Sequence, residues 1–146
     1  MKSLLTSVFL CLSFFFTSAQ SPVGKWDTYD DETNEKKSVI EIYKVGDKLY
    51  GKIIKIHDNT KADAKCTTCT DDKKDKAILG MIIMENLEKD DDEWDDGEIL
   101  DPNNGKIYDC KIWLEGNDIL KVRGYVGFFY RTQTWKRVKS VKNIIV

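Results

Sequence analysis

The sequence predicts an all-β fold, an antiparallel up-and-down β-barrel of about eight strands. Apolar and β-branched residues recur with the two-residue period of strands, and short Gly-, Asn- and Asp-rich turns separate these runs. No segment after the first 19 residues has the 3.6-residue period of an amphipathic helix. A meander of this length has to hide its edge strands. Barrel closure does so most simply, and an open sandwich is the alternative.

The first strands form a hairpin in this prediction. Residues 26–29 follow Gly24 and read as the first strand. Residues 38–43 are rich in β-branched side chains, and residues 49–56 follow a turn signal at residues 45–48. The second and third strands therefore pair with each other.

The middle of the chain is less regular. Residues 57–76 are polar, contain two cysteines and are expected to form a loop. The nearly continuous apolar run at residues 78–84 predicts a buried strand. The acidic stretch at residues 88–96 is interpreted as a loop, and residues 98–100 as a short strand after it.

The last third of the chain alternates clearly. A tight-turn signal, Asn103-Asn104-Gly105, precedes a strand at residues 107–115. Further strands are expected at residues 120–126 and 128–138, with a bend near Gly127. Side chains that we expect to point inward could fill a barrel of this size: Ile40, Ile42, Tyr50, Ile54, Tyr108, Ile112, Leu120 and Val122. The prediction is a packed interior with a small cavity near one open end.

Composition and the N-terminus bear on compartment and partners. Charged residues make up 33% of the chain, and the net charge of −2 provides no field to attract nucleic acid or anionic lipid. Residues 1–19 combine Lys2, an apolar stretch and Thr17-Ser18-Ala19, which predicts a cleaved signal peptide. The alternative interpretation is a transmembrane anchor, but the apolar stretch is too short to cross a bilayer as a helix. The residues before Cys11 lack the small side chains typical of a lipoprotein signal. We therefore expect residues 20–146 to be a single exported domain, periplasmic or extracellular, with no membrane span.

Three motifs occur in an order that resembles a known family. They are PVGKW at residues 22–26, WDDGEILDPNNGKIY at residues 94–108, and LKVRGYVG followed by RTQTWKR at residues 120–137. Together they resemble the DUF2147 family of exported bacterial proteins. The resemblance implies a lipocalin-like, calycin-type barrel, and it brings no established catalytic residue or ligand.

Within a calycin-type barrel, the residues Gly24, Trp26 and Arg137 acquire structural roles. Gly24 would allow a sharp turn where the first strand enters the barrel, and Trp26 would close one end. The resemblance implies that a basic residue of the last strand packs across the indole. Arg137 is the first choice and Arg131 the second.

The Cys66-x-x-Cys69 motif has three interpretations. It could form a local disulfide, half of a metal site with Cys110 and His57, or a thiol redox pair. Export favours the disulfide. Cys110 lies on an alternating apolar face, where a buried thiol behaves as a small hydrophobic side chain. A redox pair usually opens a helix, and no such helix is expected here.

The acidic residues at 90–98 do not match a standard calcium loop. When Gly97 is placed at the sixth position of an EF-hand, Trp94 occupies the third and Asn103 the twelfth. An irregular carboxylate site for calcium remains open, with a solvated loop as the simpler interpretation.

The sequence favours a binding role without catalysis. It has a single histidine, His57, and no Ser-His-Asp spacing, phosphate loop or two-His metal motif. We therefore expect no catalytic residue, no cofactor and no metal. The favoured function is a barrel that binds a small, partly apolar ligand. The alternative is an envelope structural or protein-interaction module with a packed interior.

Overall fold

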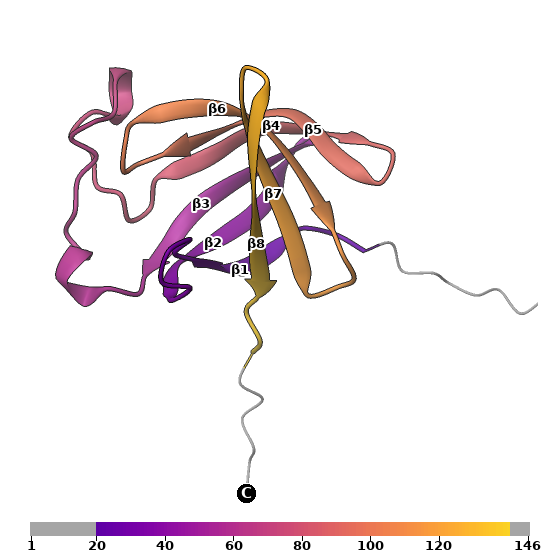
Figure 1. The fold of residues 1–146 in the computed structure, drawn as a ribbon, viewed down its shortest axis with the longest axis horizontal. Helices are drawn as coiled ribbons and strands as arrows, with labels where there is room; N and C mark the ends of the chain where they lie inside the picture. Colours follow the sequence, from indigo (N-terminus) through magenta and orange to yellow (C-terminus); the bar gives the residue numbers. More distant parts are fainter. Residues whose placement is uncertain (1–19, 141–146) are drawn as a thin grey trace, which may run out of the picture.

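The computed structural model describes residues 20–140 and forms a closed barrel of eight antiparallel strands in chain order (Figure 1). The strands are β1 Gly24–Tyr29, β2 Lys36–Val45, β3 Lys48–Ile56, β4 Ile82–Asp90, β5 Glu93–Asp101, β6 Lys106–Leu114, β7 Ile119–Val126 and β8 Phe129–Arg137. Two 3-10 turns, η1 Asn59–Lys61 and η2 Asp71–Lys73, lie between β3 and β4. The predicted fold class is confirmed. The signal-peptide prediction falls on residues 1–19, which lie outside the described residues.

A continuous apolar core fills the barrel. Its largest fully buried side chains are apolar: Trp26, Ile40, Ile42, Leu49, Met84, Leu87, Ile112 and Leu120. Trp94 and Trp135 join the same cluster. Strand side chains alternate between the two faces of the sheet, so the inward set of each strand meets at the barrel axis. This filling agrees with the expected packed interior.

The acidic stretch at residues 88–96 is a hairpin, and its prediction as a loop was wrong. β4 continues to Asp90, β5 begins at Glu93, and the turn between them is short. Leu87 is fully buried and Trp94 is only 9% exposed, so apolar residues on both sides of the turn reach the core. These two side chains hold the hairpin in the sheet while the carboxylates project into water.

Two of the predicted inward residues point outward. On β3, Leu49 and Ile53 are buried in the core, and the alternate residues Tyr50 and Ile54 are not. The pairing of β3 with both neighbours contains register shifts, one with β2 and two with β4. Burial nevertheless alternates without a break at Leu49, Gly51 and Ile53, so the two-residue period holds over this part of β3, and the prediction chose the wrong one of its two faces. The predicted strand at residues 78–84 likewise begins later, at Ile82.

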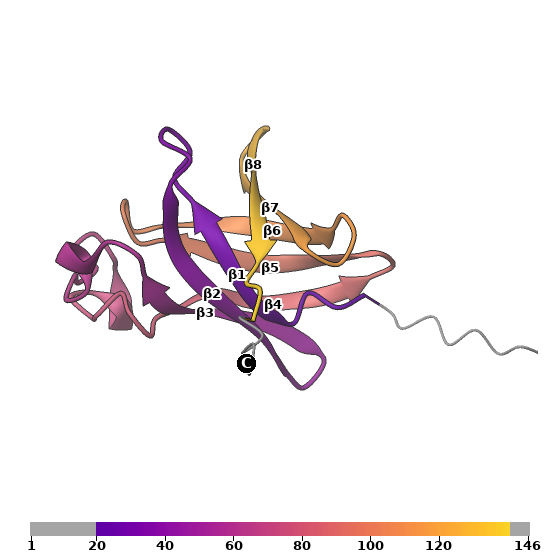
Figure 2. The same cartoon turned by 90° about the horizontal axis from the view of Figure 1, so that it is seen from below.

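The barrel closes over a short seam. β1 pairs with β8 only through Trp26 with Arg137 and Asp27 with Lys136. Beyond these pairs the β1–β2 loop and the β7–β8 hairpin rise separately on the same side of the molecule (Figure 2). Gly127 has φ 56° in the two-residue turn of this hairpin, a backbone region that type II′ turns assign to glycine.

Candidate functional site

Trp26 and Arg137, the residues expected to close one end of the barrel, stack against each other at the seam between β1 and β8. The Arg137 guanidinium lies 4.2 Å from the Trp26 ring centroid. It also donates hydrogen bonds to three carbonyl oxygens, those of Asn117 at 2.7 Å, Ser21 at 2.9 Å and Val23 at 3.0 Å. A guanidinium is planar and carries several N–H donors, so Arg137 can stack on the indole and bind carbonyl groups at the same time. These contacts link the N-terminal segment to the end of β8.

Gly24 accommodates that arginine. Its φ of 140° lies in a region that favours glycine, and a Cβ built there would stand 2.6 Å from Arg137 Nη1. A side chain at residue 24 would therefore require the Arg137 guanidinium to shift. Arg131, the second choice for stacking, instead pairs with Asp31 across the seam.

The disulfide between Cys66 and Cys69 is confirmed, with Cα atoms 5.3 Å apart. It closes a tight turn within the segment of residues 57–81, which runs between β3 and β4 along the outside of the barrel (Figure 1). Thr68 donates a hydrogen bond to the Pro102 carbonyl at 3.3 Å, and a Cβ on Gly105 would collide with the Thr68 carbonyl. Glycine in the β5–β6 turn thus allows the segment to press against the sheet.

Further backbone hydrogen bonds fix the segment of residues 57–81, which we call the roof. Cys66 donates to the Lys76 carbonyl at 2.9 Å, and Ile78 donates to that of Ala64 at 3.0 Å. Gly80 donates to the Ile53 carbonyl at 2.7 Å, which ties the end of the segment to β3. The roof is therefore attached to the barrel at both ends and crosslinked within itself.

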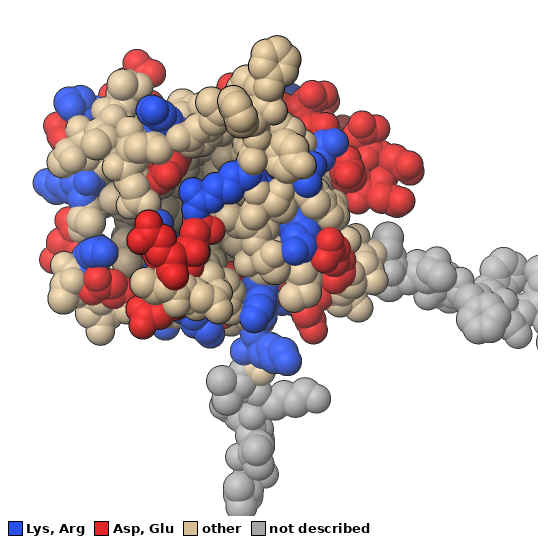
Figure 3. All heavy atoms as spheres, viewed as in Figure 1, with Lys and Arg blue, Asp and Glu red and all other residues tan. Residues whose placement is uncertain are grey.

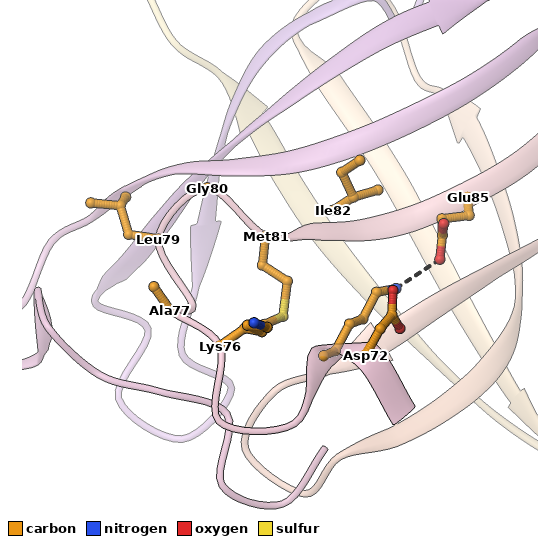
Figure 4. A pocket seen from close by; sticks show the side chains of 9 residues that line it. Asp72, Lys76, Ala77, Leu79, Gly80, Met81, Ile82 and Glu85 are labelled. Carbon is orange, nitrogen blue, oxygen red and sulfur yellow. Dashed lines mark hydrogen bonds and ion pairs between the residues drawn. The ribbon is translucent and has the colours of Figure 1, made fainter. Parts of the chain in front are cut away.

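A shallow pocket of about 400 Å³, open to solvent, lies between this roof and the start of β4 (Figure 4). Its lining includes apolar side chains from both sides, Ala77 and Leu79 from the roof with Met81 and Ile82 where β4 begins. Because Ile82 pairs with Lys52 and both are outside the core set, the pocket lies on the outer wall of the barrel. A smaller pocket of about 190 Å³ continues over Leu100 and Ile107.

Charged groups line the other side of the pocket. Lys73 donates to Glu85 Oε2 at 2.8 Å, and Glu85 borders both pockets. In Figure 4 a dashed line marks the pair of Lys73 with Glu85 beside Asp72, and the Met81 side chain points toward Lys76. The pocket thus joins an apolar floor to an edge that carries both signs of charge, an arrangement suited to a ligand with a polar end.

The other cysteine and the acidic hairpin show no reactive arrangement. Cys110 is a buried free thiol, and burial, with a smaller effect of the Asp95 charge, raises its pKa to about 12. Lys111 pairs with Glu93 at 2.8 Å and with Asp95 at 3.3 Å. The hydrogen bond to Glu93, followed by that to Asp95, holds the pKa of Lys111 above its usual range. Among residues 20–140, no three His, Cys, Asp or Glu side chains group closely enough to hold a metal ion.

His57 lies in a cluster that the sequence did not indicate. Its Nε2 is 3.1 Å from Asp27 Oδ1, and Lys36 Nζ is 2.9 Å from Asp27 Oδ2. Burial by itself raises the Asp27 pKa, but hydrogen bonds from Lys36 and His57 outweigh burial and leave that pKa lowered. The cluster fastens the start of the roof to β1 and β2. Asp27 and His57 are 30 residues apart, so only the folded sheet brings them together.

Comparison with known proteins places the barrel in a family. A model described as "Uncharacterized protein conserved in bacteria (DUF2147)" matches residues 24–137. No curated protein sequence matches the chain. Among solved structures, protein HP1028 of Helicobacter pylori, described as belonging to the lipocalin family, superposes with a TM-score of 0.73. It is 21% identical, over 83% of this chain and 85% of that one, which supports the shared fold. Within the described part of the chain, no helix is long and apolar enough to span a membrane.

Proposed function

We propose a ligand-binding function for this chain, which belongs to the DUF2147 family of bacterial proteins and folds as a lipocalin-like barrel. The ligand is small and partly apolar. It binds in the pocket beneath the disulfide-stapled roof, on the outer wall of the barrel, and the filled interior serves as a rigid scaffold.

The roofed pocket is the observation that carries this proposal. Its volume of about 400 Å³ falls within the roughly 300–1,000 Å³ of small-molecule sites, but it opens widely to solvent, and Leu79 in its lining is 43% exposed. The wall is the outer face of β4, which the packed core holds in place. The roof is stapled by Cys66–Cys69 and attached to β3 through Gly80. A site assembled before the ligand arrives binds at lower entropic cost than one that the ligand has to order.

The lining indicates the ligand's chemistry. Ala77, Leu79, Met81 and Ile82 would contact a short apolar chain or ring. Lys76 and the Lys73–Glu85 pair would contact a polar end. Methionine adapts to different apolar shapes, so Met81 favours a class of related ligands over one rigid shape.

An exported location supports this role. The disulfide persists in oxidising compartments, and the N-terminal residues read as a signal peptide. We further propose that the protein is not an enzyme. Among residues 20–140 the His57 ring bonds to Asp27 and to no hydroxyl or thiol that it could activate, and the Cys110 thiol is buried with a raised pKa.

A thermal-shift screen with a matched pair of variants tests the proposal. Fatty acids, haem, small aromatics and cell-wall fragments are screened, and native mass spectrometry of protein taken from its own envelope identifies any ligand already bound. A true ligand raises the melting temperature in proportion to the logarithm of its concentration above Kd.

The variants distinguish the pocket from the rest of the roof. Ala77→Trp places an indole in the pocket and should abolish the shift, whereas Ala62→Trp, at an exposed alanine of the same roof outside the pocket lining, should leave it intact. If both variants bind as well as the unaltered protein, the ligand does not occupy this pocket.

A second candidate function, a protein-interaction module of the envelope, rests on a different observation. The tip of the β7–β8 hairpin exposes Phe128 completely, and Phe129 and Tyr130 are 81% and 60% exposed. Contiguous exposed aromatic residues are typical of interaction surfaces. The second candidate would be favoured if the thermal-shift screen finds no ligand and a defined partner protein binds through the tip of this hairpin.

A further inference from the structure

We infer that the free edge of β8 docks an extended, acidic polypeptide segment of another protein, which adds to the barrel as a further strand. The surface consists of the backbone of residues 130–134, the aromatic hairpin tip and the cations beside them. It lies at the seam between β8 and β1, apart from the roofed pocket, and its function is independent of the ligand proposed above.

Backbone geometry shows which groups of β8 are free. The Arg137 N–H donates to Asp118 on the β7 side, and the Val138 N–H donates to Lys25 on β1. Successive residues of a strand direct their N–H and C=O groups to opposite sides. β7 pairs with β8 without a register shift, from the pair Ile119–Lys136 to the pair Val126–Phe129. Tyr130, Thr132 and Thr134 therefore direct their N–H and C=O groups toward the seam.

The seam leaves these groups without a strand to pair with among the described residues. β1 reaches β8 only at Arg137 and Lys136. Natural sheets usually protect such edges with bulges, prolines or inward-pointing charges. On this edge, the strand is regular over residues 129–136 and contains no proline, and its charged protection consists of Arg131, which pairs with Asp31 of the β1–β2 loop. Figure 3 shows the molecular surface hollowed beside β8 on this face.

An extended polypeptide fits this edge better than a lipid or a nucleic acid. Tyr130, Thr132 and Thr134 each offer one backbone donor and one backbone acceptor at every second position of the strand. A partner β-strand matches this pattern, whereas a lipid or a nucleic acid does not. The exposed side chains of Phe128, Phe129 and Tyr130 stand at one end of the edge. There they can cover apolar residues of the added strand.

Charge indicates that the segment is acidic. The Asp31 carboxylate already occupies the seam, where it pairs with Arg131 and accepts a hydrogen bond from Gln133 at 3.1 Å. On the outer side, Arg123 donates to Thr132 Oγ1 at 2.8 Å. Lys121 donates to Thr134 Oγ1 at 2.7 Å and also lies 3.8 Å from Glu115 Oε2. Cations thus stand on both faces of the edge. Carboxylates of an added strand would take over the position that Asp31 holds.

The first test is amide hydrogen exchange by NMR on the full exported chain. In the free protein the amides of Tyr130, Thr132 and Thr134 should exchange fast, while those of Arg131 and Gln133, bonded to β7, stay protected. The probe is a nine-residue peptide of alternating Val and Thr with two Asp residues. It should slow the three fast amides at least tenfold, because they become ladder donors. Equal protection of all five amides without peptide would overturn the proposal, since the edge would already be covered.

The second test uses two substitutions at one residue. Thr132→Pro removes a single donor from the free edge and keeps the β7–β8 ladder, so it should weaken peptide binding at least tenfold. Thr132→Ala keeps the N–H, so this control variant should bind the peptide within about twofold of the unaltered protein. Amide exchange of the proline variant shows whether that variant is folded. A peptide with Lys in place of Asp should also bind at least tenfold more weakly at low salt.

Three results would overturn the proposal. One is unchanged peptide binding by Thr132→Pro. Another is dimerisation of the protein through β8 in sedimentation, which would make a second copy the occupant. The third is release of the edge on deletion of residues 141–146, which would show that the chain covers its own edge. Ala77→Trp should have no effect on peptide binding, so failure here is distinct from failure of the ligand site.

Discussion

The stacking of Arg137 on Trp26 gives a prediction whose size can be worked from the structure. Trp26 is fully buried, and its indole N–H donates to the Pro22 carbonyl at 2.8 Å. Truncation of such a core aromatic costs about 3–5 kcal/mol, so Trp26→Ala should lower the free energy of unfolding by about 4 kcal/mol.

Arg137→Ala should cost less, about 2 kcal/mol. Loss of the stacked guanidinium, 4.2 Å from the ring centroid, removes about 1 kcal/mol. Loss of its hydrogen bonds to partly exposed carbonyls removes roughly another 1 kcal/mol net, because water replaces the donors. Arg137→Lys keeps the charge but not the planar fork, and should recover only part of the loss.

Urea unfolding of the two single variants and the double variant measures the coupling. If the residues act together, the double variant loses about 5 kcal/mol, and the sum of the singles is about 6 kcal/mol. Trp26→Leu replaces the alanine variant if too little of that protein folds. Additivity within roughly 0.3–0.5 kcal/mol would refute the reasoning, since distant sites behave that way.

Three further predictions concern single groups. Reduction of Cys66–Cys69 should lower the stability of the roof by about 2 kcal/mol, the chain-entropy value for so short a loop, and should weaken ligand binding, both seen by thermal unfolding with and without reductant. Because the Asp27 pKa is lowered on folding, its contribution to stability is present above its unfolded pKa near 3.8 and is lost as the pH falls through the folded value. Asp27→Asn should therefore show a shallower loss of stability below about pH 4, and parallel acid-unfolding curves would contradict this. The Cys110 thiol, with a pKa of about 12, should react with iodoacetamide only after unfolding, and one thiol labelled in the native protein at neutral pH would show it is accessible.

The fold was predictable where the local pattern and the turns agree. Residues 107–115 and 120–126 alternate cleanly around Gly116, and the structure contains β6 and β7 at nearly these positions. The acidic hairpin was missed because its charges suggested a loop. The signal that could have shown the strand is Trp94, an aromatic residue set among carboxylates, which the sheet buries.

Two features were harder to predict from the sequence: which side chains of β3 point into the barrel, and where the pocket lies. On β3 both faces carry large apolar or aromatic residues, Leu49 and Ile53 on one and Tyr50 and Ile54 on the other, so periodicity alone did not show which face enters the core. The pocket forms between the roof and β4, whose lining residues carry no periodic signal of their own. Its position depends on tertiary contacts, such as that of Gly105 with Thr68, which no local pattern encodes.

Methyl NMR of the methionines tests the central claim, that the ligand binds outside a filled barrel. Met81 lines the roofed pocket, and Met84, which is fully buried, lies in the barrel interior. The protein with labelled methionine methyl groups is titrated with the strongest binder of the thermal-shift screen. We expect the Met81 methyl resonance to shift with saturation and that of Met84 to remain nearly unchanged. A saturable shift of Met84 with Met81 unaffected would place the ligand inside the barrel and contradict the account.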